Sequence, residues 1–156
     1  MSVLALTDYR GVSESAERMR RMSREACDFA PTISLGARYA DAHDALERAC
    51  EQAAEAGWDG YGGAAVDLGA AQQAYAFLRA LPTSFPLPEI GVDPDGEILL
   101  EWDLAPRQVF SMSIDANGVV SYAGLYGKNK VHGKEHFLDV VPKAVVDALA
   151  RLFPEK

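Results

Sequence analysis

The chain has 156 residues, of which 49% are hydrophobic and 24% charged, and its formal net charge at pH 7 is −8. This length suits a single domain with its own core, spanning residues 1–156, and the composition is that of a soluble globular protein. No apolar run approaches the roughly 20 residues of a membrane span, and the first residues lack the basic stretch of a signal peptide. Cys27 and Cys50 are expected to be buried apolar side chains, so the sequence favours a cytoplasmic setting.

The negative charge is concentrated in the middle of the chain. Residues 41–125 carry 3 Lys or Arg against 14 Asp or Glu, whereas the segments on either side are close to balance. An acidic middle segment argues against non-specific binding to the phosphate backbone of a nucleic acid, so nucleic acid is not the expected partner. Two interpretations of the charge stay open: ordinary solubility, and an acidic face that meets the basic surface of another protein.

Helical periodicity dominates the first half of the chain. An apolar stripe flanked by arginines predicts a helix over 13–27, within an N-terminal segment, residues 1–30, that is loosely attached to the rest. Residues 28–37 contain proline and glycine and are expected to be a connection. A stronger amphipathic helix is predicted over 38–56, with Gly57 as the residue that ends it.

Caps and turns mark the elements of the second half. Asp67 is placed to cap a helix over 68–80, after which the apolar period changes from helical to two. Residues 93–96 (Asp-Pro-Asp-Gly) and 115–118 (Asp-Ala-Asn-Gly) have the residue types of tight turns between strands. The alternation predicts four strands, at 89–92, 97–103, 108–115 and 119–126.

The last part of the chain is expected to be a polar loop over 127–136 and then a helix over 141–153. Trp102 lies on the apolar side of its strand and is expected in the core, facing Phe110 or Met112. The sequence therefore predicts an α+β fold with N-terminal helices, a four-stranded antiparallel meander, and a C-terminal helix packed on one sheet face.

One short run stands out as a candidate binding site: residues 57–63 read G-W-D-G-Y-G-G. Its glycines also match the dinucleotide pattern G-x-G-x-x-A, but that chemistry needs a preceding strand in a parallel unit, which this sequence does not predict. The loop is either a structural corner, in which Trp58 docks and Asp59 holds backbone amides, or a recognition surface formed by Trp58, Asp59 and Tyr61. We expect Tyr61 to be the most exposed of the three.

A basic segment near the end offers a second candidate. His132, Glu135 and His136 follow the H-x-x-E-H spacing of inverted zincins, which requires a helix to bring both imidazoles to one metal. Glycine and lysines within the segment argue against that helix and that cation, so no metal and no cofactor are expected, and the two histidines are only weak candidates. As a loop, the segment with Lys128, Lys130 and His132 is a candidate site for an acidic group.

The outer side of the predicted sheet mixes acidic and apolar residues. Glu97, Glu101 and Asp103 share this side with Leu99. Three more apolar residues join them, namely Val109, Val119 and Leu125. Paired carboxylates there could serve acid–base chemistry, but acids on an outer sheet face are usually only solvated. The mixture favours an interaction surface, with Leu99, Glu101 and Asp103 as candidate binding residues, unless the N-terminal helix covers it.

The order of several motifs resembles a group of small uncharacterised bacterial proteins. The motifs are W-D-G-Y-G at residues 58–62, L-P at 81–82, D-G-E-I-x-L-E-W at 95–102, and N-G-x-x-S-Y at 117–122. The resemblance covers roughly residues 50–126. It implies the setting of mobile-element or toxin–antitoxin-like genes and brings no established activity.

These observations favour a non-enzymatic protein-interaction module of antitoxin, immunity or anti-defence type. There is no G-x-S-x-G motif, and neither cysteine has a histidine near it in a loop, so the sequence leans against an enzyme. A small enzyme using either candidate loop is the alternative. The third hypothesis is a regulator that binds nucleic acid. It would act through the arginines of the N-terminal helix, which are Arg18, Arg20, Arg21 and Arg24.

Overall fold

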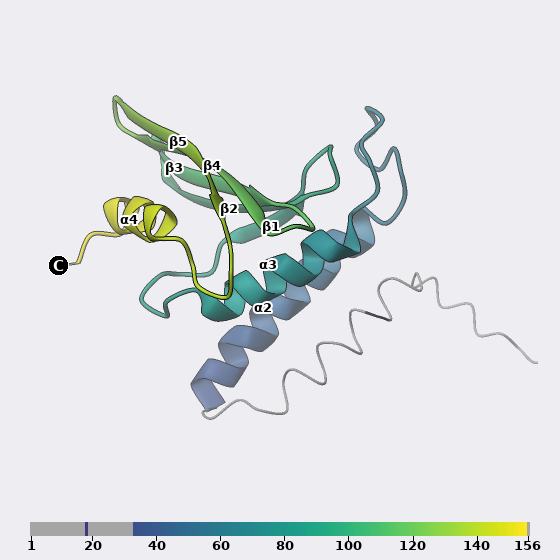
Figure 1. The fold of residues 1–156 in the computed structure, drawn as a ribbon, viewed down its shortest axis with the longest axis horizontal. Helices are drawn as coiled ribbons and strands as arrows, with labels where there is room; N and C mark the ends of the chain where they lie inside the picture. The colour runs from purple at the N-terminus through teal and green to yellow at the C-terminus, as the bar shows by residue number, and fades with distance from the viewer. Residues whose placement is uncertain (1–17, 19–32, 156) are drawn as a thin grey trace, which may run out of the picture.

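The computed structural model describes residues 18 and 33–155, and these form one layer of helices against one sheet (Figure 1). The five-stranded sheet is an antiparallel meander in the order β1-β2-β3-β4-β5. The elements are α2 (Ile33–Gln52), α3 (Leu68–Ala80), β1 (Glu89–Val92), β2 (Ile98–Ala105), β3 (Gln108–Ile114), β4 (Val119–Tyr126), β5 (Asn129–His136) and α4 (Lys143–Leu152). The predicted α+β class is confirmed.

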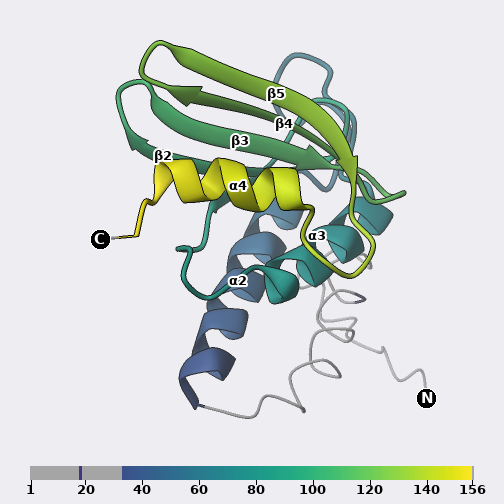
Figure 2. The same ribbon diagram turned by 60° about the vertical axis from the view of Figure 1, so that its left-hand side comes forward.

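All three helices of the described part lie on the same face of the sheet (Figure 2). Helix α2 contacts β1, α3 contacts β2 and β3, and α4 contacts β3 and β4. The core fills the space between the two layers, because the apolar residues of β2, β3 and β4 alternate toward the helices. None of the helices in this part is both long and apolar enough to cross a membrane.

The boundaries of α2 differ from the prediction. The helix begins at Ile33, so the expected connection over 28–37 is wrong for its last residues. It ends at Gln52, because the next carbonyl, that of Ala53, accepts a hydrogen bond from Val66 N at 2.8 Å and the chain leaves the helix there. Gly57 has a φ of 80° but lies beyond this end, so it does not terminate α2 as predicted. Of the predicted helix over 13–27, only Arg18 lies within the described residues.

Helix α3 and the two turns agree with the prediction. Asp67 caps α3 by accepting a hydrogen bond from Gly69 N at 2.8 Å. In the β1–β2 turn, Asp93 Oδ1 accepts from Asp95 N at 2.9 Å and Glu97 N at 3.0 Å. Asp115 repeats this arrangement in the β3–β4 turn. One carboxylate thus satisfies two backbone amides in each turn, which sets the register of both hairpins.

Trp102 occupies the core as expected. It is 3% exposed, pairs across the hairpin with Phe110, and its ring centroid lies 5.9 Å from the Phe110 ring. Its indole Nε1 donates to the carbonyl oxygen of Pro86 at 2.8 Å, so burial leaves no unsatisfied donor on this ring. The bond ties the segment before β1 to the middle of the sheet.

The sheet has a fifth strand where the sequence predicts a polar loop. Residues 127–136 form a tight turn and then β5, which pairs with β4 from Tyr126↔Asn129 to Val119↔His136. Gly127 makes the turn possible with a φ of 64°. A β-carbon on Gly133 would lie 2.5 Å from the Tyr122 hydroxyl, so the glycine leaves room for that ring. Pairing requires only backbone groups, so a strand at the sheet edge forms here without an apolar pattern.

Helix α4 is shorter than predicted and is fixed to the sheet through β4. It spans Lys143–Leu152 rather than 141–153, and Pro142 stands at its N-cap. Tyr126 donates its hydroxyl hydrogen to the Ala148 carbonyl at 2.7 Å, and the Arg151 guanidinium lies 4.3 Å from the centre of the Tyr126 ring. These contacts place α4 under the middle of the sheet and leave the opposite face to the side chains described next.

Candidate functional site: the groove on the outer sheet face

A shallow groove of about 470 Å³, wide open to solvent, lies on the sheet face opposite the helices. Mostly small side chains of the central strands line it, namely Ser111, Ser113, Ser121 and Ala123, with the larger Leu99 on the β2 side. The register places them in adjacent cross-strand rows, because Leu99 pairs with Ser113, Ser113 with Ser121, and Ser111 with Ala123. The floor of the groove is therefore mainly short hydroxyl and methyl groups, flanked by longer side chains of β2 and β5.

The two sides of this groove carry opposite charge. On one side stand Glu97, Glu101 and Asp103, from β2 and the residue before it. On the other side, the outward residues of β5 are all basic or imidazole groups: Lys130, His132, Lys134 and His136. The two borders are three strands apart, or about 14 Å. Any molecule spanning the groove therefore meets acidic groups at one side and basic groups at the other.

One hydrogen bond fixes a residue of the acidic border. Ser113 donates its hydroxyl hydrogen to Glu97 Oε2 at 2.6 Å, across the β2–β3 hairpin. The bond holds the Glu97 carboxylate against Ser113, a residue of the groove lining, and uses the hydroxyl of Ser113 as a donor. Ser113 therefore fixes the position of one carboxylate at the acidic border of the groove.

The predicted binding residues of the sheet fall in or beside the groove. Leu99 and His132 line it, and Glu101 borders it as the cross-strand neighbour of Ser111. Asp103 lies one row further along, opposite Val109.

The predicted basic residues near the end of the chain fall into two places. Lys130 pairs with Leu125 at the basic border of the groove, on the same strand as His132. Lys128 lies in the turn that joins β4 to β5. The structure thus brings the sheet residues and the β5 residues together around one groove, as opposite borders.

The glycine loop is a structural corner with one exposed aromatic residue. Trp58 packs partly buried against the core and donates its Nε1 hydrogen to the Ala64 carbonyl at 2.9 Å. Asp59 Oδ1 accepts from Gly63 N and from Tyr61 N, each at 2.9 Å, and these bonds lower the pKa of Asp59. Tyr61 is 95% exposed, as the sequence predicts.

The same loop is attached to one end of the groove. Ala64 N donates to the Pro94 carbonyl at 2.8 Å, and Asp67 N donates to the Gly96 carbonyl at 2.9 Å, so the loop runs beside the β1–β2 turn (Figure 1). Asp93 of that turn lines the groove. Trp58, Asp59 and Tyr61 themselves lie outside the lining, so the loop is a neighbour of the groove and not part of its wall.

The H-x-x-E-H spacing does not form a metal site. It lies on β5, where His132 and His136 share the outer face and Glu135 points to the other face. Two residues four apart on a strand are about 13 Å apart along the backbone, beyond the reach of one zinc ion. The inverted-zincin motif requires a helix, so its placement on the edge strand β5 excludes a zinc site of this type.

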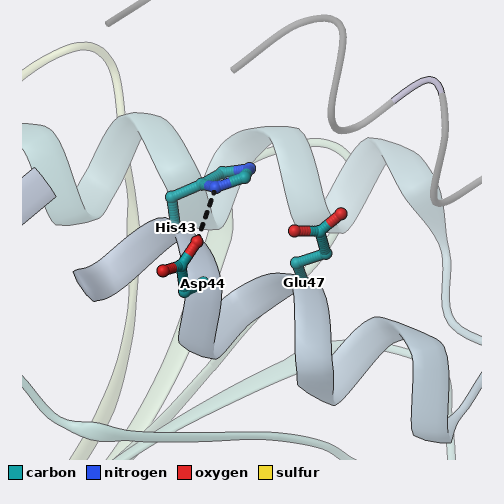
Figure 3. A group of neighbouring side chains, drawn as sticks. All are labelled: His43, Asp44 and Glu47. Atoms are coloured by element: carbon teal, nitrogen blue, oxygen red, sulfur yellow. Dashed lines mark ion pairs between the residues drawn. The ribbon is translucent and has the colours of Figure 1, made fainter. Parts of the chain in front are cut away.

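A different histidine cluster lies on α2 (Figure 3). His43, Asp44 and Glu47 place their possible ligand atoms within 4.8 Å of one another, and His43 Nδ1 lies 3.6 Å from Asp44 Oδ1. The His43 ring is buried against the edge of the Tyr75 ring, at 5.8 Å between centroids. All three come from one stretch of one helix, and no second described element adds a ligand, so we assign no metal to this cluster.

Sequence reasoning missed several groove residues. Ser111, Ser113, Ser121, Ala123 and Lys134 line the groove but were not among the predicted site residues. The alternation of β3 and β4 places the serines on the outward side, and this alternation is the sequence signal that could identify them. The signal is weak, because short polar residues on the outward side of a strand also suit plain solvent exposure.

No family model matches the chain, and no curated protein or solved structure is detectably similar to it. The resemblance to small bacterial proteins, drawn from the motifs over residues 50–126, stays a prediction.

Proposed function

We propose that this protein is a non-enzymatic interaction module that binds a segment of another protein in the groove on its outer sheet face. The observation that carries the proposal is the combination of a floor of short side chains with borders of opposite charge. A sheet face that is only solvated needs neither feature, because long polar residues anywhere on it suffice. Segregated charge at a concave surface is typical of recognition.

The same geometry supports binding over catalysis. A general base must lie within about 3 Å of the hydroxyl that it activates. His132 and Ser111 are separated by the intervening residue Ala123, so their strands are about 10 Å apart. The Ser113 hydroxyl already donates to Glu97. Ser121 lies on β4 beside β5, diagonal to His132, and no hydrogen bond joins their side chains among the described residues. Serine and imidazole groups are thus present in the groove without a hydrogen-bonded pair of the kind that activates a nucleophile.

The charges of the borders describe the partner. The acidic side, with Glu101 and Asp103, fits basic groups, which supports the expectation of a partner with a basic surface. The basic side on β5 also fits acidic groups of the same partner. The motif resemblance to proteins of mobile-element and toxin–antitoxin-like genes supports an antitoxin, immunity or anti-defence role for such binding.

Site-directed photo-cross-linking in the native host tests the proposal. A photoreactive amino acid replaces Ala123 in the groove or, as the matched control, Ala150, which is also an exposed alanine and lies on α4. We expect a discrete protein adduct from position 123 that position 150 does not give. The same adduct pattern from both positions, or none from position 123 when the protein is folded and expressed, would contradict the proposal.

A further inference from the structure

We infer that β5 is a docking edge for an extended protein segment with acidic side chains at alternate positions, which adds to the sheet beside β5. The inference rests on the proposed function and goes beyond it, since it names a second contact of the same partner, at the edge of the sheet beside the groove. Backbone hydrogen bonds would provide the attachment, and the basic border of the groove would select the sequence.

The backbone of β5 is suited to this role. It is the last strand in the sheet order, and on its outer side no strand lies among the described residues. It has 8 residues and pairs with β4 without a register shift, whereas β1 at the opposite edge has 4. In an antiparallel edge strand, every second residue directs its N–H and C=O groups away from the sheet. These groups can bind another strand along the full length of β5.

The side chains of β5 define which strand would fit. Lys130, His132, Lys134 and His136 are all exposed on the groove side. Side chains of neighbouring strands on one face lie close to each other, and opposite charges there are favourable. An added strand would therefore present carboxylates at every second position on that face. On the other face β5 presents the half-buried Val131 together with Gly133 and Glu135, so uncharged residues suit the alternate positions of an added strand.

The charge pattern also disfavours the β5 strand of a second copy of this chain as the occupant. If two β5 strands paired antiparallel, lysine and histidine of one copy would face lysine and histidine of the other on the groove side. Like charges directly opposite each other destabilise a strand pair.

An acidic segment is compatible with the net charge of −8. The acidic border of the groove is about 14 Å from β5, beyond the Debye length of about 8 Å at physiological ionic strength. A segment beside β5 is therefore attracted by its own neighbours and largely screened from the opposite border.

Peptide binding to the full-length protein tests the inference. The probe is a blocked eight-residue peptide that alternates glutamate with valine or threonine, titrated at 150 mM salt by calorimetry. We expect binding that falls at least tenfold when Lys130→Glu and Lys134→Glu are combined, and that returns when the peptide carries lysine in place of glutamate. The control variant Lys143→Glu changes an exposed lysine at the start of α4 and should leave the affinity within about twofold.

Two N-methylated peptides separate strand addition from simple charge attraction. One peptide is methylated on the backbone amides of its glutamates, and the other on the backbone amides of the residues that alternate with them. Residues two apart in a strand direct their N–H groups to the same edge, so each peptide loses the hydrogen-bond donors of one edge only. We expect one of the two to lose binding and the other to keep it. The inference is overturned if both bind like the unmodified peptide, or if no glutamate peptide binds the unsubstituted protein. Should the Ala123 cross-link persist in that case, the interaction module stands and only the edge addition fails.

Discussion

At the scale of single residues, Trp102 joins the strands to the segment that precedes them. It is 3% exposed, and its indole donates to Pro86. Replacing Trp102 with alanine should lower the free energy of unfolding by about 3–5 kcal/mol, because a large buried ring and its hydrogen bond are lost together. Chemical denaturation measures this change, and Trp102→Phe should lose markedly less. A loss below about 1 kcal/mol for the alanine variant would show that this face of β2 is not the core face.

The buried thiol of Cys50 makes the free energy of unfolding depend on pH in the alkaline range. Burial, with smaller effects from Glu47 and Glu51, raises the pKa of the Cys50 thiol from 9.0 to about 12. The unfolded chain loses this proton near pH 9 while the native protein keeps it, so the contribution is fully present below pH 9 and is lost as pH rises toward 12. The loss should approach about 1.4 kcal/mol per pH unit. Unfolding free energies between pH 9 and 11 should fall less steeply for Cys50→Ala, and equal slopes would refute the assignment.

In the glycine loop the two aromatic residues should behave differently. Trp58→Ala should lower the unfolding free energy by about 1–2 kcal/mol, since a partly buried ring and its hydrogen bond to Ala64 are lost. Tyr61→Ala should change it by less than about 0.5 kcal/mol, because Tyr61 is 95% exposed. Thermal denaturation of the two variants checks this order, and the reverse order would mean that Tyr61 supports the corner.

At the scale of elements, one hydroxyl group fixes α4 to the sheet. Tyr126→Phe keeps the ring under Arg151 but removes the hydrogen bond to the Ala148 carbonyl, and should destabilise the protein by about 1 kcal/mol. Tyr39→Phe is the matched control, because the Tyr39 hydroxyl lies 3.4 Å from the Arg79 carbonyl at an exposed position. Denaturant midpoints measure both effects. Equal losses for the two variants would show that the Tyr126 hydrogen bond has no special role in docking α4.

The elements that the sequence predicts well are those whose side chains alone determine them. The cap at Asp67 and the strict alternation around Trp102 are local signals: α3 has its predicted bounds, and β2 begins one residue and ends two residues later than predicted. The end of α2 depends on a hydrogen bond from Val66 to the Ala53 carbonyl, which no local pattern reveals. Strand β5 has no apolar period because it lies at the sheet edge, so only its pairing with β4 identifies it.

At the scale of the whole molecule, the groove results from the register of three hairpins. The sequence correctly placed Leu99 and Glu101 on the outward side, but an alternation pattern does not say which outward residues are neighbours. Register puts Ser113 beside Ser121 and places the basic strand opposite the acidic one. Because the sequence predicts a loop over residues 127–136, it does not place their lysines and histidines at the border of a groove.

Hydrogen exchange on the cross-linked partner complex tests the central claim, that the outer sheet face is the binding surface, most directly. Amide exchange is compared between the free protein and the complex captured through position 123. We predict slower exchange confined to the sheet, strongest over Asn129–His136, with α4 unchanged. Protection concentrated at residues 57–63 or along α2 and α3, with β5 exchanging as in the free protein, would contradict the account.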